Sequence, residues 1–403
     1  MSKGIKDYWI AATFVCAGLA AQGQSSAAER YSLLSRSNPA HMDVMLDRTQ
    51  WQWVRNKREL ILGTSAPDYP PFDMTVTGHD YEGFTADYAG ILGRALDLPV
   101  KVVRYETRGQ AIDALVNGEI DLLGSANGFE AAASRITLSS PYAADQPVLV
   151  TRTGETRPLS DGLNGLRLSM SYHYLPPEEI EALYPKARLE TFPSFQSAIN
   201  AVAFNQADVF LGDAISTHYM ISKGYLNNIQ MANFGRHEAN GFSFAVQAEN
   251  SELLDIVNLV LKGIPIEERI AISKRWGAGT DLLLTDQKLQ LTQREERWIA
   301  QHPTVRVVIS DAYSPLTFFD ASGNFRGITA DLLDLIRLRT GLRFQVSRAA
   351  SMSDMMNRLD QGQADLIGAM ASSDERENRF NFSRPYMDNA FVLVTRKELC
   401  RAQ

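Results

Sequence analysis

From about residue 60 onward, short apolar runs alternate with longer segments in which apolar and polar positions are mixed. The runs Leu60–Leu62, Val100–Val103 and Ile120–Leu123 are typical of strands buried on both faces, which need apolar side chains at successive positions. Between them, Phe84–Leu96 carries apolar residues at helical spacing on one face, and Ala111–Val116 predicts a second helix. This β-α-β-α-β order predicts an α/β fold with a largely parallel sheet and helices on its faces. Such sheets bind ligands in the loops at the carboxyl ends of their strands.

A second α/β segment follows the first. Its pattern predicts strands at Gly165–Met170, Asp208–Asp213 and Phe242–Val246, and helices at Pro177–Leu183 and Phe195–Phe204. Two further helices, predicted at Leu253–Leu261 and Glu267–Trp276, close this part of the chain. The polar stretch 282–303 predicts a linker helix.

An internal repeat sets the domain organisation. Gly83–Asp87 returns as Gly327–Asp331, 244 positions later, and Pro141–Tyr142 returns at the same offset as Pro385–Tyr386. Matches at one offset over roughly ninety residues indicate two copies of one domain. The second copy contains the counterpart of residues 60–152 and then reaches Gln403. We therefore expect a fragment, a truncated reading frame, or a protein with one complete clamshell and half of another.

The repeat and the element pattern together predict the domain boundaries. We expect a signal peptide at 1–28, a first domain at 58–278, a linker helix at 282–303 and a partial second domain at 304–403. Within the first domain, the expected first lobe comprises 58–152 and 247–278, and the second lobe comprises 155–246. The unfinished second domain should expose apolar surface and aggregate unless a partner covers it.

The first residues and the composition indicate an exported globular protein. Lys3 and Lys6 precede the apolar run Ile10–Ala21, and small and polar residues follow, as in a secretory signal; an uncleaved short anchor is the alternative. Cys16 and Cys400 are the only cysteines, so the exported part can form no internal disulfide. No later stretch is apolar enough to span a bilayer, and the net charge of −7 argues against a nucleic-acid partner.

Motifs for catalysis and for metal or cofactor binding are not found in this sequence. The six histidines are scattered without metal-ligand spacing, and no nucleophile-elbow, Walker or dinucleotide-binding pattern occurs. We therefore expect neither a cofactor, a metal nor a catalytic site in this chain.

Several motifs resemble those of a known family when taken in order. They are Asp68–Phe72, Tyr81–Phe84, Gly118–Asp121, Ser140–Tyr142 and Lys274–Gly277. In this order the chain resembles the bacterial extracellular solute-binding proteins of family 3, which have a two-lobed "Venus flytrap" fold. The tandem copies joined by 291–303 are similar to the periplasmic sensor region of BvgS-like hybrid histidine kinases. The resemblance implies a periplasmic-binding-protein-like clamshell, followed by the first lobe of a second copy.

This resemblance also implies how a ligand would be held. In the family, an aromatic side chain from the Pro-Pro-Phe loop packs on the ligand, an arginine after the third strand binds its carboxylate, and an acid on the far lobe binds its ammonium. Copy two carries Ser373 and Arg376 at the carboxylate motif, whereas copy one carries Phe129 and Ala132. Arg135 could substitute from a neighbouring turn. Copy one is therefore not expected to bind an ordinary α-amino acid in the family's manner, and a closed, ligand-free structural role is consistent with Ala132.

Each candidate ligand-binding residue also has a structural interpretation. The aromatic residues could be packing after a turn, Ser125 and Asn127 could be turn residues, Asp213 could cap a helix, and His173 could be structural. Arg376 could be a surface charge. The turn that carries Tyr172, His173 and Tyr174 could instead present backbone amides to an anion. The candidates are Tyr69, Phe72, Ser125, Asn127, Tyr142, Tyr172, His173, Asp213, Ser373 and Arg376.

Three functions are compatible with these observations. The first is a periplasmic sensor whose partners are a small ligand (an amino acid or small carboxylate), the membrane kinase portion of the same protein, and a second copy in a homodimer. In this hypothesis, ligand binding shifts the opening of the clamshell. The second is the binding protein of an amino-acid transporter, which would leave the tandem copies unexplained. The third is an enzyme on the same fold, such as a dehydratase or transglycosylase, for which no placed acid or base is found.

Overall fold

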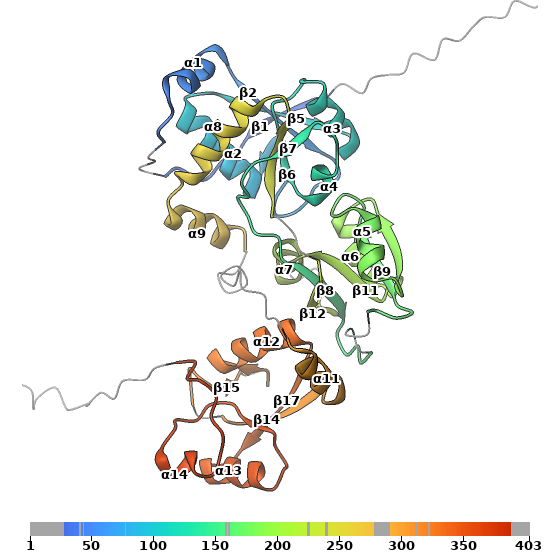
Figure 1. Ribbon diagram of the computed structural model, residues 1–403, viewed down its shortest axis with the longest axis vertical. Helices are drawn as coiled ribbons and strands as arrows, with labels where there is room; N and C mark the ends of the chain where they lie inside the picture. Colours follow the sequence, from blue (N-terminus) through green and yellow to red (C-terminus); the bar gives the residue numbers. More distant parts are fainter. Residues whose placement is uncertain are drawn as a thin grey trace, which may run out of the picture. The chain divides into compact units, whose positions relative to one another are not determined.

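The computed structural model describes residues 28–39, 42, 44–76, 78–157, 159, 162–223, 226–237, 241–277, 291–311, 313–320 and 323–387 (Figure 1). These residues form two compact units, one largely before residue 278 and one largely after residue 290. The predicted signal peptide, apart from Ala28, lies outside the described residues, as do Cys16, Cys400 and residues 282–290 of the predicted linker. Among the described residues, no helix is long and apolar enough to cross a membrane.

The first lobe of the first unit is built on a mixed sheet with the strand order β3-β4-β1-β5-β2-β6-β13-β7. The strands are β1 (Glu29–Leu33), β2 (Leu60–Ser65), β3 (Met74–Val76), β4 (Asp80–Glu82), β5 (Val100–Tyr105), β6 (Leu122–Ala126), β7 (Ile136–Leu138) and β13 (Ser243–Gln247). The helices are α1 (Arg48–Asn56), α2 (Phe84–Leu96), α3 (Arg108–Val116), α4 (Gly128–Ala131), α8 (Ser251–Lys262) and α9 (Ile266–Arg275). β2 pairs in parallel with both β5 and β6, in agreement with the parallel sheet predicted from the β-α-β-α-β order.

The side chains of alternate residues in these central strands point to opposite faces of the sheet. Leu62, Val102 and Leu122 lie in register in one row, and α2 packs against β5. The next row, with Val103 and Leu123, contacts Ala111, Leu115 and other apolar residues of α3 and β13. This side-chain alternation explains why the central strands read as continuous apolar runs, because both of their faces are covered.

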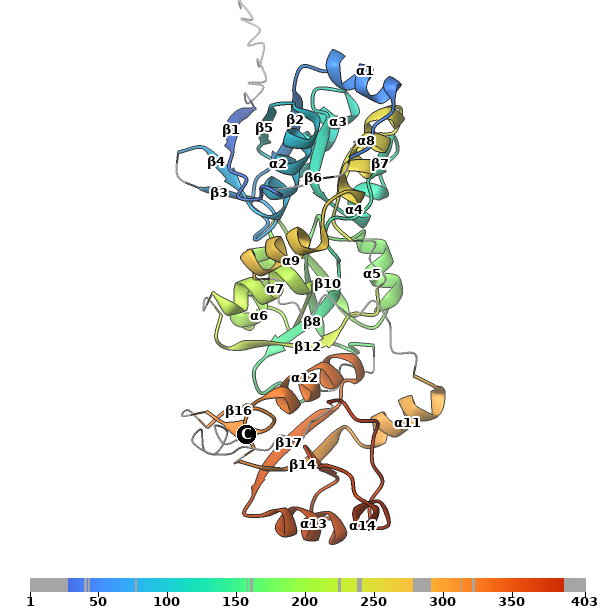
Figure 2. The same cartoon turned by 90° about the vertical axis from the view of Figure 1, so that its left-hand side faces the viewer.

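The second lobe contains a sheet with the order β10-β9-β11-β8-β12. Its elements are β8 (Pro147–Arg152), β9 (Arg167–Ser171), α5 (Pro177–Leu183), β10 (Arg188–Phe192), α6 (Phe195–Ala203), β11 (Val209–Asp213), α7 (Ala214–Ser222) and β12 (Ile229–Phe234). In Figure 2 this lobe carries α6 and α7 on its left side and α5 on its right. The predicted helices and strands of this segment are confirmed to within two residues at each end.

The predicted boundaries between the two lobes are wrong by one strand each. β8 pairs with β11 and therefore belongs to the second lobe, although residues 147–152 were assigned to the first. β13 pairs with β6 and β7 and therefore belongs to the first lobe, although residues 243–246 were assigned to the second. An apolar strand run does not reveal which sheet it joins, because both sheets bury strands of the same composition.

The second unit repeats the first lobe of copy one. α12 (Ile328–Thr340) and α13 (Met352–Asp360) have the bounds of α2 and α3 shifted by 244 positions. Its other elements are α11 (Gln293–Gln301), β14 (Thr304–Ser310), β15 (Phe318–Phe319), β16 (Phe325–Arg326), β17 (Arg343–Ala349), β18 (Leu366–Ile367) and α14 (Asp374–Glu377). The hydroxyl groups of Thr85 and Tyr142 are 2.9 Å apart in copy one, and those of Thr329 and Tyr386 are 2.8 Å apart in copy two. The same fold and the same internal contact therefore occur twice.

An N-terminal strap, defined as residues 28–37, is tied to the first lobe through the buried Asp87 on α2. Its strand β1 pairs with β4 and β5, which the sequence did not predict (Figure 2). Asp87 is fully buried; it accepts hydrogen bonds from the Arg36 backbone amide (2.6 Å), the Arg275 guanidinium (2.6 Å) and the Trp276 indole (2.8 Å). One carboxylate thus joins the strap, α2 and the end of α9.

Candidate functional site

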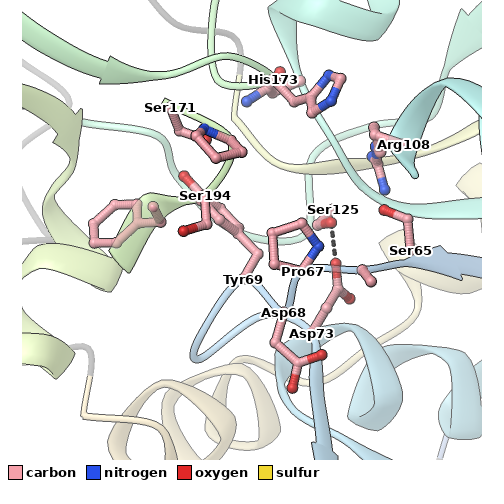
Figure 3. A pocket seen from close by; sticks show the side chains of 14 residues that line it. Ser65, Pro67, Asp68, Tyr69, Asp73, Arg108, Ser125, Ser171, His173 and Ser194 are labelled. Carbon is pink, nitrogen blue, oxygen red and sulfur yellow. Dashed lines mark hydrogen bonds between the residues drawn. The ribbon is translucent and has the colours of Figure 1, made fainter. Parts of the chain in front are cut away.

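A small cavity lies between the two lobes of the first unit, at the ends of β2, β6 and β9 (Figure 3). Ser65, Tyr69, Arg108 and Asn127 line it among others from the first lobe, and Ser171, His173, Ser194 and Phe195 line it from the second. Its volume is about 50 Å³. Pockets for small organic ligands usually measure about 300–1,000 Å³, and one buried water needs about 10–15 Å³. The first unit is therefore a nearly closed clamshell whose cavity has room for a few waters.

A direct hydrogen bond from Tyr69 to Asp213 joins the two lobes. The Tyr69 hydroxyl donates to Asp213 Oδ2 over 2.7 Å, and Asp213 is fully buried. The Tyr69 ring packs against Phe195 of the second lobe, with 5.4 Å between ring centroids, and against Phe72 and Phe242, each at 5.9 Å. Tyr69 therefore provides both polar and apolar contacts across the closed cleft.

Asp213 also caps helix α7, so it has both the cleft position and the capping role that the sequence suggested. Its Oδ1 accepts a hydrogen bond of 2.7 Å from the Ser216 amide at the start of α7. Burial raises the pKa of Asp213 above the ordinary value, although the hydrogen bonds from Ser216 and Tyr69 act in the opposite direction. Burial and the Asp213 charge also raise the pKa of the Tyr69 hydroxyl, which keeps this phenol protonated as the donor.

A second buried acid lies beside Asp213, in the segment that enters β8. The Tyr174 hydroxyl donates to Asp145 Oδ1 over 2.8 Å, and the buried Asp145 Oδ2 has no hydrogen-bond partner among the described residues. Pro147 pairs with Asp213 across the sheet, which places Asp145 close to it in the fold. Burial and the charge of Asp213 raise the pKa of Asp145 well above its ordinary value. No sequence motif identifies Asp145.

A buried ion pair supplies a guanidinium to the cavity wall. Arg108 Nε donates to Glu130 Oε1 over 2.7 Å, and the two side chains are 8% and 1% exposed. Arg108 Nη2 donates to the Gly124 carbonyl over 2.8 Å. Burial alone would lower the pKa of Arg108, but the nearby charges, Glu130 first among them, more than offset this and raise it. The cavity wall therefore contains a cation whose charge is already neutralised.

The two copies place their arginines differently. Arg108 begins α3, and Met352 holds the matching place at the start of α13. Conversely, Ala132 of copy one corresponds to Arg376 of copy two. The suggestion that Arg135 could replace the missing arginine is wrong, because Arg135 is exposed and pairs with Glu249 on the surface. The sequence missed Arg108 because a charged residue at a helix start is ordinarily solvent-exposed.

A small aromatic cluster lies at one end of the cavity. Phe129 occupies the place that corresponds to Ser373 in copy two, and its ring lies 4.9 Å from His173 and 5.6 Å from Tyr172, both in the second lobe. Burial, followed by the charge of Arg108, lowers the pKa of His173 to about 4. His173 is therefore neutral near pH 7, and its buried Nδ1 has no hydrogen-bond partner in the part of the chain that the structure describes.

The other predicted site residues fall into three groups. Ser125 and Asn127 line the cavity; the Ser125 hydroxyl donates to Asp73, and Asn127 caps α4. Phe72 and Tyr142 are buried and do not line the cavity, and Tyr172 is 47% exposed. Ser373 and Arg376 belong to the second unit, where Ser373 caps α14 and Arg376 donates to the Ala371 carbonyl over 2.8 Å. Within the part of the chain that the structure describes, no cluster of histidine, cysteine or acidic residues is arranged to hold a metal.

The fold and its small interlobe cavity define a class: the two-lobed α/β clamshells of the Venus flytrap, or periplasmic-binding-protein-like, type. The family model for bacterial extracellular solute-binding proteins, family 3, matches residues 60–279 and again 305–400. The chain belongs to this family.

Two groups of relatives align with more than nine tenths of this chain. The chain is 41% identical over 380 residues to the "Virulence sensor protein BvgS" of Bordetella parapertussis, covering 94% of this chain and 31% of that protein. It is 26% identical over 374 residues to the "Sensor protein EvgS" of Escherichia coli K12, covering 91% of this chain and 31% of that one. The chain thus spans about a third of the length of these curated relatives.

A solved structure agrees with this grouping. The crystal structure of the B. pertussis BvgS periplasmic domain is 40% identical in sequence and has a TM-score of 0.68. The match covers 89% of this chain and 70% of that one. The separate BvgS VFT2 domain, 23% identical with a TM-score of 0.54, shows the same fold.

Proposed function

We propose that this chain is the periplasmic sensor portion of a BvgS-like sensor kinase, and that copy one closes on its own side chains instead of on a free α-amino acid. The observation that carries the proposal is the 2.7 Å hydrogen bond from Tyr69 to Asp213. In the family, the acid at the Asp213 position binds the ammonium of the ligand. Here a hydroxyl of the opposite lobe takes that place.

The remaining polar groups of the cleft support the same conclusion. Arg108, the cation in the cavity wall, is neutralised by Glu130, and Asp73 accepts hydrogen bonds from Ser125 and Tyr81. An α-amino acid would have to displace Tyr69 and find a cation other than a paired arginine. Because a cavity of about 50 Å³ offers it little room, the proposed resting state of copy one is closed and free of an amino acid.

In this proposal the signal is a change in the balance between closed and open lobes. A stimulus can shift that balance only by interacting differently with the two states. Opening would expose Asp213 and separate the Phe129 and His173 rings, so side chains of both lobes set the closed population. The proposal further places the chain in the periplasm, joined to a membrane kinase portion.

The test is a chimaera in which this chain replaces the matching region of B. pertussis BvgS, with kinase autophosphorylation as the output. We expect Tyr69→Phe to change the output, because it removes the bond between the lobes. The matched control is Tyr184→Phe, which removes a buried hydroxyl that accepts a hydrogen bond from the Arg236 amide within the second lobe. Equal outputs from Tyr69→Phe and the unmodified chimaera would contradict the proposal.

A ligand screen tests the amino-acid part of the proposal separately. A compound at one hundred times its Kd stabilises its binding state by about 2.7 kcal/mol, which raises the melting temperature measurably. We expect α-amino acids to leave the melting temperature of the first unit unchanged in the full chain. A clear rise with any α-amino acid would overturn the closed, self-filled description of copy one.

A further inference from the structure

Two carboxylic acids with no cation beside them are buried where the lobes meet. Asp213 is 0% exposed and Asp145 is 8% exposed. Neither acid has an ion-pair partner among the described residues, and each receives a hydrogen bond from a tyrosine, Tyr69 or Tyr174. The nearby Thr217 hydroxyl is buried and has no hydrogen-bond partner among the residues that the structure describes. An isolated buried carboxylate is so costly that one of two such neighbours is expected to be protonated.

The surrounding ionisable groups do not supply the missing positive charge. On the loop that carries Tyr69, Asp68 pairs with Arg104 and Asp73 is bonded to Tyr81 and Ser125. His173 is neutral near pH 7, and burial lowers the pKa of His218 on α7. The segment after β12 carries the exposed Arg236, as well as His237. The side chains of Asp145 and Asp213 do not line the cavity, so a proton is the cation that fits between them.

We propose that Asp145 and Asp213 share one proton in the closed clamshell, and that its release to water favours opening. The inference rests on the proposed function, because it needs lobes that open and close. Asp145 is the acid that holds the proton, since Tyr174 is its single donor among the described residues, whereas Asp213 accepts from both Tyr69 and the Ser216 amide at a helix start.

The direction of the pH effect follows from burial. Asp145 is desolvated in the closed state, and opening exposes the pair to water. The pKa of Asp145 is therefore higher in the closed state than in the open state. The stabilisation of the closed form is fully present below the open-state pKa and is lost as the pH rises from there through the raised closed-state pKa. For one proton, the closed-to-open ratio falls by about tenfold per pH unit between these two pKa values and is constant above the higher one.

The experiment measures the distance between the lobes in the full chain as a function of pH. Spin labels are attached through Asn117→Cys, at the end of α3, and Glu181→Cys, on α5, both exposed, after Cys16→Ser and Cys400→Ser. Double electron–electron resonance is recorded from pH 5 to pH 9. We expect a short distance at low pH that converts to a longer one as the pH rises. A distance distribution that stays constant across this range would overturn the proposal.

Two variants make the assignment specific. Asp145→Asn mimics the protonated acid and should keep the lobes closed at every pH. Tyr174→Phe removes the hydrogen bond that lowers the pKa of Asp145, so the opening transition should move to higher pH. The matched control, Glu249→Gln, alters an exposed acid and should leave the transition in place. A pH dependence in Asp145→Asn equal to that of the unmodified chain would contradict the proposal.

The two proposals fail in distinguishable ways. If Tyr69→Phe lengthens the distance but pH does not, the closed clamshell stands and the proton switch is refuted. If neither change lengthens it, the moving clamshell is refuted as well.

Discussion

The buried pair of Arg108 and Glu130 allows a quantitative test of the burial within the first lobe. The side chains are 8% and 1% exposed, and their contact is 2.7 Å long. Removing one partner of a buried pair leaves an uncompensated charge and costs about 3–5 kcal/mol. Glu130→Gln keeps the shape and can still accept hydrogen bonds, so we expect about 3 kcal/mol. For a domain of this size, each kcal/mol lowers the melting temperature by about 2–4 °C, which gives a decrease of about 6–12 °C.

The second half of this test uses the residue that copy two already contains. Arg108→Met introduces the side chain of Met352 and leaves Glu130 buried without its cation, so it should cost a similar amount. The double variant Arg108→Met/Glu130→Gln buries no charge at this position and should lose less than the sum of the two single variants.

Scanning calorimetry of the full chain measures all three variants. Arg135→Ala is the control, because it removes an exposed pair whose loss should leave the melting temperature unchanged. If the single effects add to within about 0.5 kcal/mol in the double variant, the two residues do not interact and the argument is refuted.

Two further predictions concern pH and the buried Asp87. The pKa of His173 is lowered to about 4 from an ordinary 6.5, so the unfolded chain binds a proton at a higher pH than the folded chain does. The free energy of unfolding therefore falls as the pH drops from about 6.5 to about 4. His173→Gln should therefore reduce the loss of melting temperature between pH 7 and pH 4, and an unchanged loss would contradict the burial of this ring. Asp87→Ala should lower the free energy of unfolding of the first unit by about 3–5 kcal/mol, because it removes the acceptor of the buried Trp276 indole and the ion-pair partner of Arg275. Calorimetry should show the transition of the second unit unchanged, and a loss shared by both units would refute this local effect.

The repeat explains why so much of the fold could be predicted from the sequence. Adding the repeat offset of 244 to the bounds of α2 and α3 predicts the bounds of α12 and α13. This works because the same spacing of apolar side chains builds the same sheet twice. The strap and β1 were missed because residues 29–33 carry too little apolar alternation to show that they join a sheet edge. Sheet membership of β8 and β13 was missed because it depends on long-range pairing.

The site was less predictable for a related reason. Tyr69 and Asp213 were both candidates, but they are 144 positions apart in the chain, and only the closed lobes show that they contact each other. Arg108 and Asp145 were not candidates, because burial gives them their unusual properties and no local motif identifies them. Sequence motifs of the family describe how a ligand is held, and they contain no signal for side chains that take the ligand's place.

The Asp87 junction gives the first unit a mechanical anchor. A tension applied to the chain beyond Gly277 would pass through Arg275 and Trp276 into a single carboxylate, and from there into α2 and the strap. Because three elements share this attachment, displacing the end of α9 loads the strap and the sheet edge together. The first lobe would then move as a rigid body, and the segments that connect the two lobes would be the part of the unit that bends.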